Sequence, residues 1–113
     1  MLTIDALRSF GADVDSGLGR CMDNESFYFR LVKMALEDAS FERLSAAAAS
    51  GDVKAAFEAA HSLKGVLGNL SLTPLFAPAS EITELLRSGT AVDVSVQLAE
   101  LAAQRAKLRE ICG

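Results

Sequence analysis

The chain has 113 residues, of which 50% are hydrophobic and 23% are charged, and its formal net charge is −4. This length and apolar content suit one domain with a single core. A mildly acidic chain without a cluster of Lys and Arg lacks the positive surface that nucleic acid and anionic membranes attract, so we exclude both as partners. The longest apolar run, residues 46–49, is far shorter than the roughly 20 residues of a membrane-spanning helix.

The N-terminal residues and the two cysteines indicate where the protein acts in the cell and whether it holds a metal. Residues 1–5 lack the basic region and apolar core of a signal peptide, so we expect a cytoplasmic protein. The two cysteines, Cys21 and Cys112, lie far apart without the spacing of a zinc or redox motif, and we expect free thiols. One histidine and two distant cysteines do not assemble a metal site, and we predict none.

Two short helical segments are predicted within residues 1–22. The first spans Leu2 to Phe10 and ends at Gly11, and the second spans Asp13 to Leu18 with the aspartate as its cap. Such short pieces are unstable alone, so we expect them to pack across one end of a larger body.

A longer helix is predicted from a cap at Asp23 or Asn24 through Asp38. Its apolar stripe is expected at Phe27, Leu31, Met34 and Ala35. The helical pattern of apolar residues begins again at Ser40 and continues to Ser50 and Gly51. The sequence leaves open whether residues 24–50 form one kinked helix or two.

Three further helices complete the pattern. The first begins after a cap at Asp52, ends near Ser71 or Leu72, and has a bundle-type seam at Ala56, Ala60, Leu63, Leu67 and Leu70. The second runs from a Thr73 cap to Ser88, and the third from about Val92 to Ile111. We therefore predict a single all-α domain over residues 1–113. An antiparallel four-helix-bundle core (23–113) carries short additional N-terminal helices (1–22).

The only histidine, His61, lies on the helix after Asp52, about 100° around from the seam residue Ala60. The core pattern is complete without it, so we expect the imidazole to face solvent. Gly65 and Gly68 share its face, although a glycine inside a helix costs about 1 kcal/mol relative to alanine. They would leave a flat strip open to an approaching group. Lys64, one turn on, places a cation where an anion on the ring would lie. This combination indicates a histidine that receives a phosphoryl group.

Phe57, one turn before His61, has two possible roles. It could fold into the core, or its exposed part could provide an apolar contact for a docking partner. The alternative for His61 itself is an ordinary surface residue of a bundle helix.

The stretch from Ala60 to Leu70 is similar to the core motif of histidine-containing phosphotransfer (HPt) domains, which act in multistep phosphorelays. His61, Leu63, Lys64 and Gly65 match the His-x-Leu-Lys-Gly motif, and the resemblance extends to Gly68, Asn69 and the turn at residues 50–52. Ser71 departs from it, because the family commonly has a glycine there.

The resemblance implies that His61 accepts a phosphoryl group from the aspartate of one receiver domain and passes it to another. Lys64 would neutralise charge on the phosphoryl oxygens, and Phe57, Gly65 and Gly68 would form the docking surface. The receiver would supply Mg²⁺, so no cofactor of the chain's own is expected. The protein would be a phosphotransfer intermediate without autonomous kinase activity, and we expect a monomer.

Other classes of protein remain as alternatives. The dimerisation region of a sensor histidine kinase usually has an acidic residue after the histidine and a proline a few residues later, where this chain has Ser62 and Val66. The phosphoacceptor domain of a chemotaxis kinase would be part of a much longer chain. A hydrolase would need a nucleophile facing its base, but neighbours such as Ser62 and His61 point apart on a helix. A helical adaptor that binds signalling partners without phosphorylation would be indifferent to substitution of His61.

Overall fold

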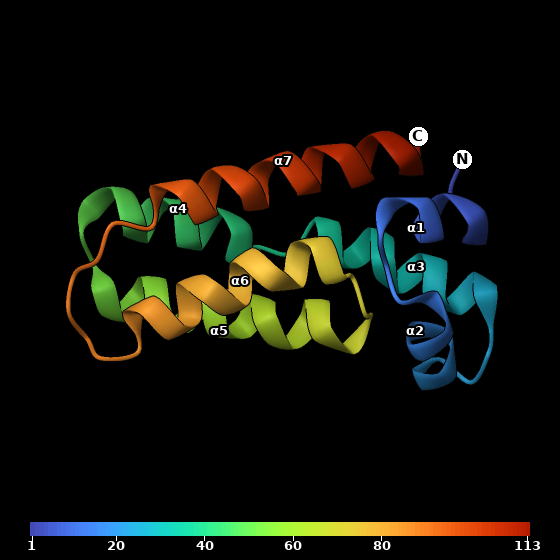
Figure 1. Cartoon of the computed structure of the whole chain (residues 1–113), viewed down its shortest axis with the longest axis horizontal. Helices are drawn as coiled ribbons and strands as arrows, with labels where there is room; N and C mark the ends of the chain where they lie inside the picture. The colour runs from blue at the N-terminus through green and yellow to red at the C-terminus, as the bar shows by residue number, and fades with distance from the viewer.

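The computed structural model describes all residues, 1–113, and is entirely helical (Figure 1). The helices are α1 (Ile4–Phe10), α2 (Val14–Arg20), α3 (Glu25–Leu36), α4 (Ser40–Ser50), α5 (Val53–Asn69), α6 (Thr73–Leu86) and α7 (Ser95–Cys112). The predicted all-α fold is therefore confirmed. None of these helices combines the length and the apolar sequence that crossing a bilayer requires.

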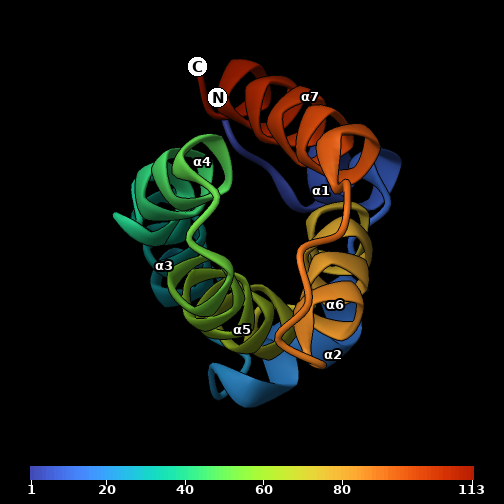
Figure 2. The same ribbon diagram turned by 90° about the vertical axis from the view of Figure 1, so that its left-hand side faces the viewer.

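The bundle has four sides, of which α3 and α4 together form one and α5, α6 and α7 form the others (Figure 2). The view along the bundle shows these elements arranged around a common centre. That centre holds fully buried aliphatic side chains from different helices, among them Leu44, Leu63, Leu75, Ile82 and Leu108. The short helices α1 and α2 lie at one end of the bundle, as their pattern predicts (Figure 1).

Residues 24–50 form two helices, which answers the question that the sequence leaves open. Helix α3 ends at Leu36 and α4 begins at Ser40. The carboxylate of Asp38 accepts a hydrogen bond of 2.8 Å from the backbone N–H of Ser40. This bond satisfies one of the free N–H groups at the start of α4 and makes the break a defined turn.

The buried face of α3 differs from the predicted stripe. Tyr28, Val32, Ala35 and Leu36 are buried, whereas Met34 is 62% exposed and Phe27 and Leu31 are only half-buried. The prediction was correct at Ala35, was borne out in part at Phe27 and Leu31, which pack against the edge of the core, and was wrong at Met34.

The reason for this rotation is a long-range contact of Tyr28. Its hydroxyl donates a hydrogen bond of 2.8 Å to the carbonyl of Leu70 at the end of α5. Its ring lies against Gly17, where an added Cβ would stand 2.6 Å from the hydroxyl oxygen. The absence of a side chain at Gly17 lets α2 and α3 approach closely enough to bury Tyr28.

The cap predicted at Thr73 and the helix start predicted near Val92 both differ from the observed positions. Helix α6 has Leu72 as its cap, with Thr73 as the first helical residue. Helix α7 begins at Ser95, whose N–H donates to the carboxylate of Asp93 at 2.9 Å. This local turn at Asp93 delays the helix, while Val94 still reaches the core.

The turn between α5 and α6 is held by Arg20 from α2. One guanidinium nitrogen, Nη1, donates to the carbonyls of Gly68 (3.1 Å) and Asn69 (3.3 Å) and to the hydroxyl oxygen of Ser71 (2.8 Å). Ser71 adopts a left-handed backbone, with φ at +55°, a conformation that suits glycine better. The N-terminal helices therefore brace the end of the helix that carries His61.

Candidate functional site

His61 lies in the middle of α5 with its side chain exposed to solvent, which confirms the expected exposure. On the opposite side of the helix, Ala60, Leu63 and Leu67 are fully buried in the core. The imidazole is thus presented on a helix that is anchored along its whole length, and a partner can reach it without any change in the bundle.

Phe57 stacks on the imidazole. The two rings have centroids 5.8 Å apart and an angle of 5° between their planes, which is a parallel, offset arrangement. Phe57 is half-buried, so it serves both as packing and as part of the surface. On α5 it stands one turn before His61, and its contact restricts the orientation of the imidazole.

A second helix contributes two charged side chains that the sequence prediction missed. The carboxylate of Glu84 on α6 receives two hydrogen bonds from Arg87, from Nε at 2.8 Å and from Nη2 at 3.0 Å. The same carboxylate lies 3.6 Å from Nζ of Lys64. The guanidinium of Arg87 in turn stands 5.5 Å from the centroid of the Phe57 ring. A signal for the Glu84–Arg87 pair exists in their spacing of three residues, but nothing local places the pair beside His61.

These charges act on one another. The hydrogen bond from Arg87 is the main cause that lowers the pKa of Glu84 below its ordinary value, with a smaller contribution from Lys64. The carboxylate therefore stays ionised at neutral pH. Lys64, the cation predicted to lie near the imidazole, has an anionic neighbour on α6.

The two glycines of the predicted open strip have different surroundings. A Cβ added to Gly65 would meet nothing within 4 Å, so the backbone here is open to an approaching molecule. A Cβ added to Gly68 would lie 3.1 Å from Cε1 of Phe76 on α6. Gly68 therefore admits the Phe76 ring, and the open strip ends between the two glycines.

The model of one protein family, described as Hpt domain, matches residues 30–111. The chain belongs to the Hpt domain family. A search of curated proteins and a search of solved structures each found no match. The matched range begins within α3 and extends almost to the end of α7, so it contains His61 and its neighbours from both α5 and α6. Helices α1 and α2 lie outside the matched range. At family level, the function is histidine phosphotransfer in phosphorelays.

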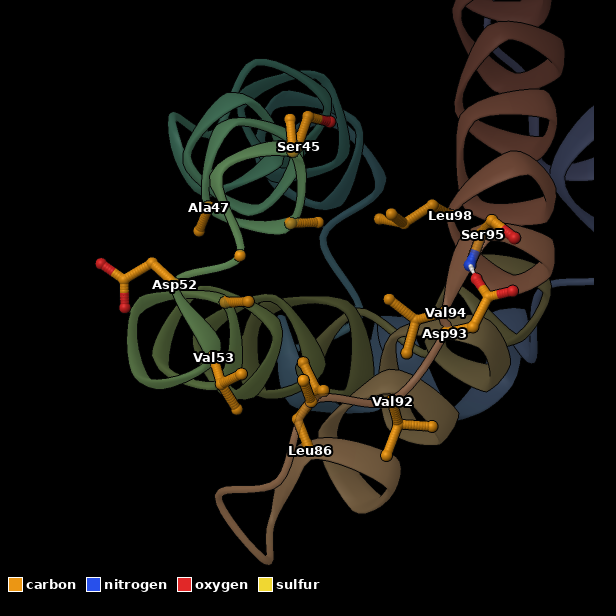
Figure 3. Close-up of a pocket in the computed structure, with 15 residues that line it drawn as sticks. Ser45, Ala47, Asp52, Val53, Leu86, Val92, Asp93, Val94, Ser95 and Leu98 are labelled. Carbon is orange, nitrogen blue, oxygen red and sulfur yellow. Dashed lines mark hydrogen bonds between the residues drawn. The ribbon is translucent and has the colours of Figure 1, made fainter.

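A cavity of about 380 Å³ lies away from His61, at the end of the Hpt domain where α4 turns into α5 (Figure 3). It opens between that turn, the end of α6 and the segment that leads into α7. Val53, Leu86, Val94 and Leu98 are among the apolar side chains around it. None of the predicted site residues lines this cavity.

Both cysteines of the chain are free thiols, as expected. Cys21 is buried, whereas Cys112 is half-buried, and burial raises the pKa of the Cys112 thiol. The structure brings no three His, Cys, Asp or Glu side chains together in one cluster.

Proposed function

We propose that this Hpt domain shuttles phosphoryl groups between receiver-domain aspartates in a two-component phosphorelay, with His61 as the phosphoacceptor. The observation that carries the proposal is the exposed imidazole on a helix whose opposite face is buried, beside a cation and an open backbone. Phosphoryl transfer asks mainly for positioning and for neutralisation of charge, and these residues offer both.

In the transfer step, the lone pair of the unprotonated ring nitrogen of His61 forms an N–P bond. The P–O bond to the receiver aspartate breaks, and its electron pair stays with the carboxylate that leaves. The proton on the other ring nitrogen is then released to solvent. Transfer to a second receiver reverses these bond changes, so the domain ends as it began.

The neighbours of His61 have distinct parts in this proposal. Phe57 fixes the plane of the imidazole through its stacked ring, and its exposed part meets the receiver. Lys64 neutralises charge on the phosphoryl oxygens. Gly65 leaves room for the receiver's active site. Gly68 leaves room for the ring of Phe76 on α6, which would form the edge of the docking surface.

The receiver would supply the Mg²⁺ that phosphoryl transfer needs, so the Hpt domain itself requires no cofactor and has no kinase activity of its own. Its partners would be the receiver domains of hybrid histidine kinases and response regulators. Such partners are cytoplasmic, and we expect this domain to act there as a monomer.

The test is a reconstituted relay with a labelled donor receiver and a second, unlabelled receiver. Label should pass to the second receiver only when the Hpt domain is present, and His61→Gln should abolish the passage. Ser62→Ala, which changes the adjacent exposed residue, should leave it intact. Passage that survives His61→Gln would overturn the proposal. Binding of a receiver without any transfer would favour the alternative function, that of a helical adaptor that binds signalling partners without phosphorylation.

A further inference from the structure

Five side chains form a series of contacts across the surface between α5 and α6, from His61 to Lys64. His61 stacks on Phe57, Arg87 lies over Phe57, and Glu84 binds Arg87 and approaches Lys64. Lys64 stands three residues after His61, on the same face of α5. The two cations of this series, Arg87 and Lys64, thus share one carboxylate.

Glu84 holds these two cations unequally. Its contacts with Arg87 are two aligned hydrogen bonds at 2.8 and 3.0 Å, a geometry that the planar guanidinium favours. The 3.6 Å separation from Lys64 Nζ is too long for a hydrogen bond. The Lys64 contact is to Oε1, the oxygen that already accepts the hydrogen bond from Arg87 Nη2. Lys64 is therefore the cation that can leave.

We propose that Glu84 is a positioning residue that holds Lys64 while His61 is unphosphorylated and releases Lys64 to the phosphoryl group once it is on His61. This inference rests on the proposed function of His61. Glu84 touches neither the imidazole nor the incoming group. It acts through the lysine, as a competing anion.

The charges favour such an exchange. A phosphoryl group on a side chain carries about −1.5 to −2 at neutral pH, more than the single charge of a carboxylate. The ammonium of Lys64 is a compact charge on a flexible stem, so it can turn from α6 toward the ring without any movement of the backbone. Arg87 keeps its two hydrogen bonds to Glu84, so only the contact between Glu84 and Lys64 is lost.

Removal of the competing carboxylate should make Lys64 more available to the phosphoryl group. Glu84→Gln should therefore raise the equilibrium constant for transfer from a phosphorylated receiver onto His61. Exposed ion pairs have modest coupling, which corresponds to an increase of about two- to fivefold at low salt. Glu81→Gln makes the same change of charge at an exposed position of α6 that has no ion pair, and it should leave the constant nearly unchanged.

The experiment measures that equilibrium constant for the full chain with one isolated receiver domain, phosphorylated with a small phosphodonor. An equilibrium among the free species is independent of how tightly the two proteins dock, so a change in the docking surface does not imitate the effect. The same pair of glutamine variants is measured in a Lys64→Met background. There, the effect of Glu84→Gln should disappear, since the lysine through which it acts is absent.

Two results would overturn the inference while the proposed function stands. One is an equal constant for Glu84→Gln and Glu81→Gln, and the other is an effect of Glu84→Gln that persists without Lys64. If the wild-type chain takes no phosphoryl group from the receiver, the proposed function fails and the inference fails with it. Thermal unfolding of each variant verifies that the bundle is intact.

Discussion

The imidazole of His61 lies parallel to the ring of Phe57, with an angle of 5° between them and 5.8 Å between their centroids. This relationship joins the exposed residue of α5 to the packing between α5 and α6, because Phe57 is half-buried and Arg87 covers it. An exposed imidazole on a helix would otherwise rotate among its side-chain rotamers. The stack thus supplies orientation at a position that must also remain accessible.

Replacement of Phe57 by leucine should slow transfer onto His61 severalfold, because leucine keeps an apolar side chain but loses the parallel ring. An aromatic pair contributes about 0.5–1.5 kcal/mol beyond its buried area, so a loss of about 1 kcal/mol in the free energy of unfolding is also expected. Phe57→Tyr keeps the ring and is the matched control. Transfer rates and urea unfolding measure the two effects, and equal rates for leucine and wild type would contradict the orienting role.

Substitution at Gly65 should separate folding from docking. Gly65→Leu should leave the bundle folded, since the space beside Gly65 is open, and it should gain up to about 1 kcal/mol from helix propensity. The leucine side chain would nevertheless stand where a receiver approaches, and transfer should fall by at least tenfold. Unfolding curves and transfer rates are the measurements. Undiminished transfer would argue against the open backbone as a docking surface.

The two glycines should respond differently to alanine. Gly65→Ala should stabilise the protein by up to about 1 kcal/mol. Gly68→Ala should give a smaller gain or a loss, because the new methyl group would lie 3.1 Å from the Phe76 ring and force it to shift. Urea unfolding of both variants tests the comparison, and equal stabilisation would show that Phe76 yields freely.

Tyr28, the only tyrosine of the chain, should make stability sensitive to alkaline pH. Burial raises its pKa from 10.0 to about 12, so the neutral phenol is favoured in the folded state. Its contribution is complete below pH 10, where the phenol is neutral in both states, and is lost as pH rises toward 12.

Tyr28→Phe is the corresponding test. It should cost about 1–3 kcal/mol at neutral pH, because the Leu70 carbonyl loses its buried donor. It should also flatten the decline in stability above pH 10 relative to wild type. Stability against pH for both proteins provides the measurement. An identical alkaline decline would mean that Tyr28 does not titrate in this range.

Arg20 should stabilise the bundle from outside the range that the family model matches. Arg20→Met removes the hydrogen bonds to Gly68, Asn69 and Ser71, and we expect a loss of about 1 kcal/mol in the free energy of unfolding. Arg8→Met removes only an exposed pair with Asp15 and should cost much less. If the two variants unfold alike, the brace on the end of α5 contributes nothing measurable.

The parts of the fold that sequence predicts are those that depend on local pattern. Asp13, Asn24 and Asp52 accept hydrogen bonds from backbone N–H groups as predicted helix caps. The seam from Ala56 to Leu70 is buried throughout, because it repeats over four turns of one helix. The same pattern places His61 outside the core, and its exposure follows.

The parts that sequence does not predict depend on contacts between distant residues. The centre of the buried face of α3 was not predicted, because Tyr28 finds its partner 42 residues away and a local apolar period contains no information about that hydrogen bond. Glu84 and Arg87 are ordinary surface charges by sequence, since only the pairing of α5 with α6 brings them to Lys64 and Phe57.

The most direct test of the account is the mass of the intact protein after incubation with a phosphorylated receiver domain, under neutral or basic conditions. The wild type should gain the mass of one phosphoryl group, lose it on acid treatment, and yield a modified fragment that contains His61. His61→Gln should gain nothing. A phosphoryl group on the His61→Gln protein, or none on the wild type with any receiver from the same organism, would contradict the central claim.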